Sequence, residues 1–237
     1  MSRSYYPAPF TSAHTRANIV KVLLIIGAGT SGISLLIDAL SFALPAVAEE
    51  QELSDNPVGA VVMLFSFLLA ILDGLIYLVT AVFFLLWLYR AYSNLRAFNP
   101  SRPLDHSAGW AVASFFIPIA NLFVPYRAVK EVWQKSGPPG EAFLYEPSPP
   151  ATFPAWWTFW LLASFANNIS MRVSFDEDVP LSTVTIVSVI ASALSVLSAV
   201  FAYVVVNAID KRQEETIGRL QLQPFPGPPP PQTSYYT

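Results

Sequence analysis

The sequence predicts an all-α integral membrane protein with four transmembrane helices plus a re-entrant or interfacial segment on the cytoplasmic side. The first observation is compositional: 54% of the 237 residues are hydrophobic and only 12% are charged, against about 25% charged residues in soluble domains. The second is that apolar runs of roughly 20 residues or more, enough to cross about 30 Å of hydrocarbon, recur along the chain. Because backbone groups in lipid must be paired within their own segment, we expect these runs to be helices.

The apolar runs set the domain organisation. Predicted spans cover about residues 19–44, 58–88, 155–173 and 181–206. They belong to one transmembrane helical domain, 18–220, between a flexible N-terminal tail, 1–17, and a Pro-rich disordered C-terminal tail, 221–237. Ala46-Val47-Ala48 is similar to a signal-peptidase site, but the preceding apolar core exceeds the about 7–15 residues of a signal peptide. We therefore expect the first span to be retained, with cleavage after Ala48 as the alternative.

The stretch 110–126 is apolar, but Pro118, Asn121 and Pro125 interrupt it. Proline removes a backbone donor and clashes with the preceding turn of a helix. Even as an unbroken helix the stretch would be roughly 24 Å long, which is short of a crossing. We predict a re-entrant or interfacial segment at 110–134 that ends in a surface helix, with a fifth crossing as the alternative.

The basic residues predict the orientation. With four spans and a cytoplasmic N-terminus, twelve of the thirteen lysines and arginines fall in cytoplasmic segments and only Arg172 falls outside. A bias of Lys and Arg in short loops is what orients membrane proteins. A fifth crossing would instead move Arg127, Lys130 and Lys135 to the outside. The sequence therefore favours a multi-pass plasma-membrane protein with both termini in the cytoplasm.

Small residues in the first span match a nucleotide-binding motif. Residues 27–32, Gly-Ala-Gly-Thr-Ser-Gly, fit the pattern G-x-G-x-x-G. That motif functions between a strand and a helix of a parallel sheet, whereas this chain is predicted to form membrane helices. Small residues four apart instead allow close helix packing, and the fourth span carries a similar stripe of serines and alanines. We expect these faces to pack helices together or to join copies in a homo-oligomer.

Asp73 lies near the middle of the second span. An ionisable residue inside the membrane is a functional-site hypothesis by default. Its candidate partners are Asn167 and Asn168 of the third span, or serines of the fourth. One interpretation is a hydrogen-bonded carboxyl group that holds helices together. The alternative is an ion or proton site in a small oligomeric transporter or channel.

The inner end of the second span and the segment after it combine aromatic, cationic and amide side chains. Tryptophan and tyrosine prefer the headgroup level of a bilayer, and arginine reaches phosphates there. Simple anchoring is one interpretation. The sharper hypothesis is a lipid-headgroup or protein-partner site on the cytoplasmic face, residues 87–135, with these candidates: Arg90, Asn94, Arg96, Asn121 and Trp133.

The sequence holds no standard catalytic set, so we expect a non-enzymatic binding or scaffold protein without a cofactor. Its two histidines lack metal-ligand spacing and it contains no cysteine. Neither a nucleophile elbow nor a P-loop is present. The net charge of −3 gives no basic footprint for nucleic acid. The expected partners are the lipid bilayer and, for the Pro-rich tail, an aromatic-groove module of another protein.

The cytoplasmic segments also resemble a known family. The residues that carry the resemblance are Trp87-Leu88-Tyr89-Arg90-Ala91-Tyr92-x-Asn94-Leu95, Gly109-Trp110, Phe116-Ile117-Pro118-Ile119-Ala120-Asn121-Leu122-Phe123-x-Pro125-Tyr126, Glu131-x-Trp133-x-x-Ser136 and Arg212-Gln213-Glu214. The pattern resembles the bacterial membrane family called domain of unknown function 4328, over about residues 58–213. The resemblance implies a bacterial multi-pass protein whose characteristic element runs from Trp87 to Trp133. It assigns no activity, substrate or functional residue.

Overall fold

The protein is all-helical in the residues that the structure describes. The computed structural model describes residues 9–43, 57–98, 102–137 and 147–222. Helices and no strand occur within these ranges, which confirms the all-α fold class. The Ala46-Val47-Ala48 sequence, residues 1–8 of the predicted N-terminal tail and residues 223–237 of the predicted C-terminal tail lie outside the described residues.

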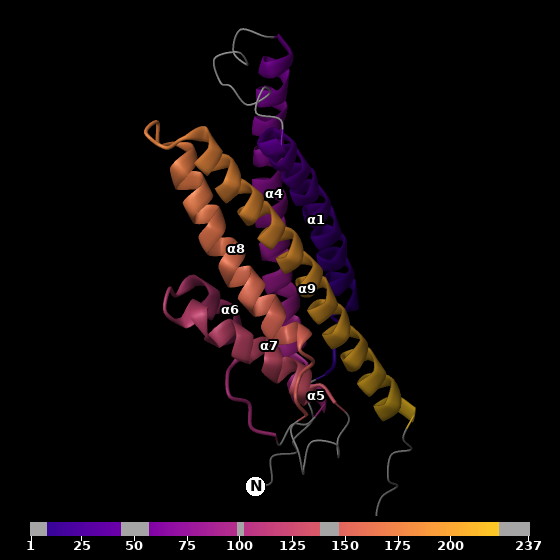
Figure 1. The fold of residues 1–237 in the computed structure, drawn as a ribbon. Coiled ribbons are helices and arrows are strands. Elements are labelled where there is room, and N and C mark those ends of the chain that lie inside the picture. Colours follow the sequence, from indigo (N-terminus) through magenta and orange to yellow (C-terminus); the bar gives the residue numbers. More distant parts are fainter. Residues whose placement is uncertain (1–8, 44–56, 99–101, 138–146, 223–237) are drawn as a thin grey trace, which may run out of the picture.

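Four long helices form the body of the molecule (Figure 1): α1 His14–Ala43, α4 Pro57–Ser93, α8 Thr152–Ser174 and α9 Leu181–Leu222. Each coincides with one of the four apolar runs predicted to span. Three helical segments are long and apolar enough to cross a membrane: 14–40 of α1, 64–98 of α4 and the adjoining α5, and 181–221 of α9. The fourth, α8, is long enough but less apolar. α9 continues without a break beyond its apolar part into a polar end.

The long helices pack in the order α4, α1, α9, α8. α1 packs against both α4 and α9, and α9 packs against both α1 and α8. Side-chain pairs follow the contact between α8 and α9. The rings of Phe159 and Phe201 stack with centroids 5.3 Å apart, and Ser170 Oγ lies 3.0 Å from Ser188 Oγ. The two helices therefore run antiparallel, side by side.

The apolar parts of these helices are exposed. Leu36, Phe67 and Phe165 are 64%, 63% and 58% exposed. Only 6% of the most apolar window of α1, and 6% of that of α4, is buried within the protein. Soluble monomers rarely expose apolar patches of this extent, whereas the lipid-facing surface of a membrane helix is apolar. The exposed faces are therefore compatible with a membrane.

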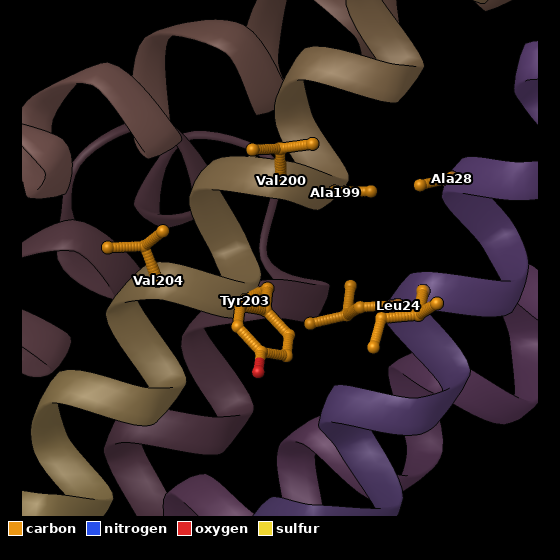
Figure 2. A pocket seen from close by; sticks show the side chains of 7 residues that line it. Leu24, Ala28, Ala199, Val200, Tyr203 and Val204 are labelled. Atoms are coloured by element: carbon orange, nitrogen blue, oxygen red, sulfur yellow. The ribbon is translucent and has the colours of Figure 1, made fainter.

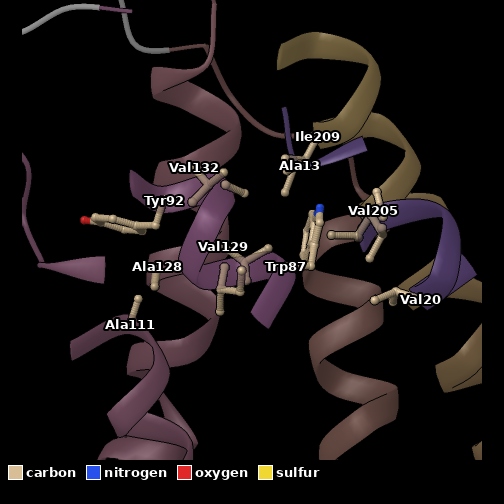
Figure 3. Packing of buried hydrophobic residues seen from close by; sticks show 14 of the residues in the cluster. Ala13, Val20, Trp87, Tyr92, Ala111, Ala128, Val129, Val132, Val205 and Ile209 are labelled. Carbon is tan, nitrogen blue, oxygen red and sulfur yellow. The ribbon is translucent and has the colours of Figure 1, made fainter. Parts of the chain in front are cut away.

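The buried core gathers at one end of the molecule. We call this the basal end; it holds the described residues of 9–20, 87–137, 147–157 and 202–222, at the bottom of Figure 1. Its core combines apolar side chains from α1, α4, α7, α8 and α9. Trp87 is fully buried among Ala13, which precedes α1, Val20 of α1, and Val205 and Ile209 of α9 (Figure 3).

The segment between α4 and α8 forms a helical hairpin at the basal end. Its elements are α5 Leu95–Phe98, α6 Ala108–Ala113, the 3₁₀ turns η1 Ser114–Phe116 and η2 Ala120–Leu122, and α7 Val124–Lys135. Ser107 caps α6 because its side chain accepts a hydrogen bond from the Trp110 N–H. Pro118 lies between the two 3₁₀ turns, and Pro125 lies in the first turn of α7, where its missing N–H is not needed.

The two ends of the hairpin meet. The Tyr92 hydroxyl contacts both His106, which precedes α6, and Glu131, which lies in α7. The chain therefore reverses direction within 110–126 and returns to the place from which it started. The continuous fifth helix that hydropathy alone allowed is not formed, because prolines interrupt the stretch at positions 118 and 125.

A shallow apolar groove lies between α1 and α9 (Figure 2). It has a volume of about 260 Å³ and is lined by Leu24, Ile25, Ala28, Ala199, Val200, Tyr203 and Val204. Gly27 faces α4 instead, where an added Cβ would lie 3.5 Å from Ile76 Cγ2. Gly29 and Gly32 have no such neighbour within 4 Å among the described residues. In this glycine motif, close approach to another helix is therefore confined to Gly27.

Candidate functional site

A buried carboxylate, Glu131, fastens the hairpin to α4. Its side chain is 3% exposed. Oε1 accepts hydrogen bonds from the Lys135 ammonium group and the Asp105 N–H, each at 2.6 Å. Oε2 accepts one from the Tyr92 hydroxyl and lies 3.1 Å from His106 Nδ1. One side chain thus joins α4, the segment before α6, and α7.

The hydrogen-bond donors keep Glu131 ionised. Burial raises the pKa of this carboxyl group, but the hydrogen bonds from Lys135 and the three other donors outweigh burial and hold the pKa of Glu131 below its usual 4.5. Lys135 is also buried, and it donates a further hydrogen bond to the Pro103 carbonyl oxygen at 2.9 Å. Such additional hydrogen bonds are what make a buried ion pair tolerable.

A second polar network attaches α9. Gln213 is 2% exposed. Its Nε2 donates to the Ala91 carbonyl oxygen at 2.8 Å and to Ser136 Oγ at 3.0 Å, and its Oε1 accepts from Asn94 Nδ2 at 3.3 Å. Thr216 Oγ1 donates to the Ser136 carbonyl oxygen at 2.8 Å. The polar end of α9 is thereby fixed to the ends of α4 and α7.

A third set of contacts fixes the start of α1. Asp210 of α9 is buried, and its Oδ2 lies 3.1 Å from Lys21 Nζ and 2.9 Å from His14 Nδ1. Ahead of α1, the Thr11 N–H donates to Asn94 Oδ1 at 3.3 Å, and the Thr11 carbonyl oxygen accepts from Asn94 Nδ2 at 3.0 Å. The first described segment is therefore part of the basal end and not a separate tail.

Two of the predicted headgroup or partner residues, Asn94 and Trp133, make side-chain contacts within the protein, and a third, Asn121, is half-buried. Asn94 is 2% exposed, and its amide group serves the two networks just described. Trp133 packs edge-on against Phe153 with ring centroids 5.8 Å apart, and the Arg212 guanidinium lies 4.6 Å from its centroid. Asn121 lies in η2, and its Oδ1 is buried without a hydrogen-bond partner among the described residues.

The other two predicted residues face outwards. Arg90 is half-buried near the end of α4, and Arg96 is exposed in α5. The structure thus does not gather the five predicted side chains into one pocket. The two arginines are the members of the predicted set that a ligand can reach.

The residues predicted as one intramembrane polar site bond to different helices. Ser34 Oγ of α1 donates to Asp73 Oδ2 at 3.3 Å. Asn167 Nδ2 donates to Ser195 Oγ of α9 at 3.0 Å, and Asn168 donates to a carbonyl oxygen of its own helix. Hydrogen bonds between helices of this kind hold membrane bundles together.

The tip of the hairpin is apolar and exposed. Phe116, Ile119 and Phe123 are 71%, 78% and 58% exposed. The turn is fixed to α8 because Trp157 Nε1 donates to the Leu122 carbonyl oxygen at 3.0 Å. An exposed apolar patch on an otherwise well-fixed turn marks a contact with a membrane or with another protein.

A comparison with family models identifies the chain's relatives. The model for a domain of unknown function (DUF4328) matches residues 50–211. This chain belongs to that family. No curated protein and no solved structure matches it. The match covers α4, the hairpin and α8, and so it includes the network around Glu131.

The family pattern in this chain coincides with packing contacts. Tyr92, Glu131 and Ser136, which carry the resemblance, are members of the buried networks. Residues 116–121, the aromatic-Pro-Ile-Ala-Asn run, form the turn of the hairpin. Within the described ranges, no group of three His, Cys, Asp or Glu side chains is placed to hold a metal ion. The pattern therefore marks how the basal end of this family member folds.

Proposed function

We propose that the chain is a non-enzymatic, four-span protein of the bacterial plasma membrane whose basal end lies at the cytoplasmic leaflet and binds anionic lipid headgroups. The observation that carries the proposal is how charge is distributed there. The buried acids are paired inside the protein, whereas these outward cations make no ion pair in the described part of the chain: Arg90, Arg96, Arg127 and Lys130. Cations at this level attract anionic lipids.

The pairing of α8 with α9 supports a fourth span. α8 follows α9 from the Phe159–Phe201 ring stack to the Ser170–Ser188 contact. Because α8 follows the apolar part of α9, this pairing supports a crossing of the bilayer by α8 as well. Its 23 residues measure about 34 Å, enough for about 30 Å of hydrocarbon.

The contacts between the hairpin and α8 support a shallow, interfacial position. Phe115 packs against Trp160 with ring centroids 6.3 Å apart. Trp160 lies about 12 Å along α8 from its first residue, Thr152, at 1.5 Å per residue. The hairpin therefore accompanies α8 for less than half of the about 30 Å of a bilayer core. Phe116 and Ile119 at its tip then lie among acyl chains, as in other interfacial elements.

A transporter that uses Asp73 is the rival proposal, and the contacts favour it less. Both carboxyl groups of the spans bond to a neighbouring helix, Asp73 to Ser34 at 3.3 Å and Asp38 to Ser192 at 3.2 Å. The groove between α1 and α9 is lined by apolar side chains and Tyr203, which offers an ion little coordination. These features support helix association rather than a pathway.

The proposal predicts selective retention of anionic lipid. Protein in a non-ionic detergent is offered equal amounts of phosphatidylglycerol and phosphatidylcholine, and bound lipids are counted by native mass spectrometry. We expect the wild type to prefer phosphatidylglycerol by about fivefold or more, since each surface cation contributes about 1 kcal/mol. A variant with Arg90, Arg96, Arg127 and Lys130 all replaced by Gln should lose the preference.

Two outcomes would count against lipid binding. Equal retention of the two lipids by the wild type would contradict the proposal. An unchanged preference in the four-cation variant would place the binding elsewhere on the molecule. Specific crosslinking of the basal end to a protein, without any lipid preference, would replace the lipid by a protein partner.

A further inference from the structure

At the basal end, the Arg16 side chain of α1 reaches the turn of α4 that carries Arg90. Arg16 Nη1 of α1 donates to the Leu86 carbonyl oxygen of α4 at 3.3 Å. In an α-helix this oxygen also accepts from the N–H four residues later, which is that of Arg90. Both arginines are half-buried. The Arg16 guanidinium therefore lies at the turn of α4 from which the Arg90 side chain extends.

No acidic side chain of the described residues forms an ion pair with either arginine. The next cation along α1, Lys21, is by contrast paired with Asp210 at 3.1 Å. Two guanidinium groups that come together repel each other, and an anion between them removes that repulsion. A phosphate has several oxygens and can accept hydrogen bonds from the N–H groups of both guanidinium groups.

The surroundings of the two arginines indicate which kind of phosphate binds. Val82 and Leu86 precede Arg90 by two turns and one turn on the same face of α4, and each is 48% exposed. Tyr89 beside them is 50% exposed, as is common for tyrosine at the headgroup level. The cationic site thus lies where a lipid-facing apolar surface ends. This position suits the phosphate of a phospholipid whose acyl chains cover Val82 and Leu86.

We propose that Arg16 and Arg90 form a binding site for the phosphate group of an anionic phospholipid. The site rests on the proposed function and specifies its residues and its ligand. It differs from the set predicted from sequence, because Arg16 enters it, Asn94 is buried in the interior and Asn121 lies in η2 of the hairpin. The headgroup is held by both helices, so the bound lipid also joins α1 to α4.

The test compares Arg16→Gln/Arg90→Gln with a control of equal charge, Lys211→Gln/Arg219→Gln, which changes two exposed cations of α9 outside the set of four named above. Each detergent-solubilised protein is titrated with phosphatidylglycerol, with phosphatidylcholine and with inorganic phosphate. We expect affinity for phosphatidylglycerol to fall about fivefold for each site arginine and about 25-fold for both. The control should change by less than about twofold. Arg16→Lys/Arg90→Lys keeps the charge but loses the paired N–H donors of the guanidinium groups. Its affinity for phosphatidylglycerol should therefore lie between those of the wild type and the Gln variant.

The possible results separate the site from the general function. Equal losses in the two Gln variants would assign binding to the overall charge of the basal end and overturn the site, while the proposed function stands. Inorganic phosphate that binds as tightly as the lipid and displaces it would overturn the assignment to a phospholipid. A wild type without preference for phosphatidylglycerol would overturn both. If the Gln variant does not fold, the Lys variant decides: an affinity equal to that of the wild type would overturn the claim that two guanidinium groups bind the phosphate.

Discussion

Replacing Glu131 by alanine is expected to lower the free energy of unfolding by about 3–5 kcal/mol, because it leaves a buried charge without its counter-ion. That charge is the Lys135 ammonium group, in a residue that is 6% exposed. The donors of Tyr92, Asp105 and His106 lose their shared acceptor as well. The loss can be measured by urea unfolding in mild detergent, followed by tryptophan fluorescence from the basal core.

Two further variants make this result specific. Glu215, an exposed glutamate of α9, is the matched control, and Glu215→Ala should stay within about 0.5 kcal/mol of the wild type. Adding Lys135→Met to Glu131→Ala should recover part of the lost free energy of unfolding, since it removes the unpaired ammonium group. A loss below about 1 kcal/mol for Glu131→Ala would contradict the role of this carboxylate as the centre of the network.

The same loss has a defined pH dependence. The pKa of Glu131 is lowered in the folded protein from its usual 4.5, so the unfolded chain takes up this proton more readily. The stabilisation by Glu131 is therefore fully present above the unfolded pKa and is lost as the pH falls through the lower folded value. The stability difference between wild type and Glu131→Gln should be constant from about pH 7 to pH 5 and narrow at lower pH.

Truncating Trp87 to alanine should also cost about 3–5 kcal/mol, the usual range for a buried tryptophan. Trp87 is fully buried and packs on Phe84 with ring centroids 5.4 Å apart. Its indole Nε1–H has no hydrogen-bond partner among the described residues. Trp87→Phe therefore breaks no hydrogen bond and removes an unpaired buried donor, and it should cost much less than Trp87→Ala.

The neighbouring aromatic residue provides the control for Trp87. Tyr89 lies on the same helix but is 50% exposed, so Tyr89→Ala should lower the free energy of unfolding only slightly. The measurement is the same urea titration, read by circular dichroism because the substitution removes a fluorophore. Equal losses for Trp87→Phe and Trp87→Ala would show that the indole group makes a contribution that ring packing does not explain.

The long helices and the reversal could be predicted because their causes are local. An apolar run specifies a membrane helix by its own length and composition, and Pro118 and Pro125 interrupt only the helix in which they lie. The prediction was less accurate at the helix ends. α1 begins at His14, ahead of the predicted start at residue 19, because Ala13 and Ala17 are buried in the basal core.

The basal networks could not be predicted because they join residues far apart in the chain. Tyr92 and Glu131 are separated by 39 positions, and Gln213 and Ala91 by 122. The one local signal was the spacing of Glu131 and Lys135, four residues apart on a helix. It does not say that the pair is buried, or which hydroxyl and imidazole groups complete it.

The burial of Asn94 also could not be predicted from the local sequence. An asparagine just beyond an apolar span is typical of a residue at the membrane surface, and this led to its prediction as a ligand. Its burial follows from Thr11 on one side and Gln213 on the other. Neither neighbour is indicated by the local sequence around position 94.

The side of the membrane on which the basal end lies is the central claim, and cysteine labelling tests it most directly. The chain contains no cysteine, so Arg96→Cys, Ser148→Cys and Glu177→Cys can be made singly in the native background. All three positions are exposed: the first lies in α5 at the start of the hairpin, the second follows the hairpin, and the third lies between α8 and α9. A membrane-impermeant maleimide should label positions 96 and 148 only in inside-out vesicles, and position 177 only in intact spheroplasts. Labelling of positions 96 and 148 from opposite sides would contradict both the four-span arrangement and the cytoplasmic basal end.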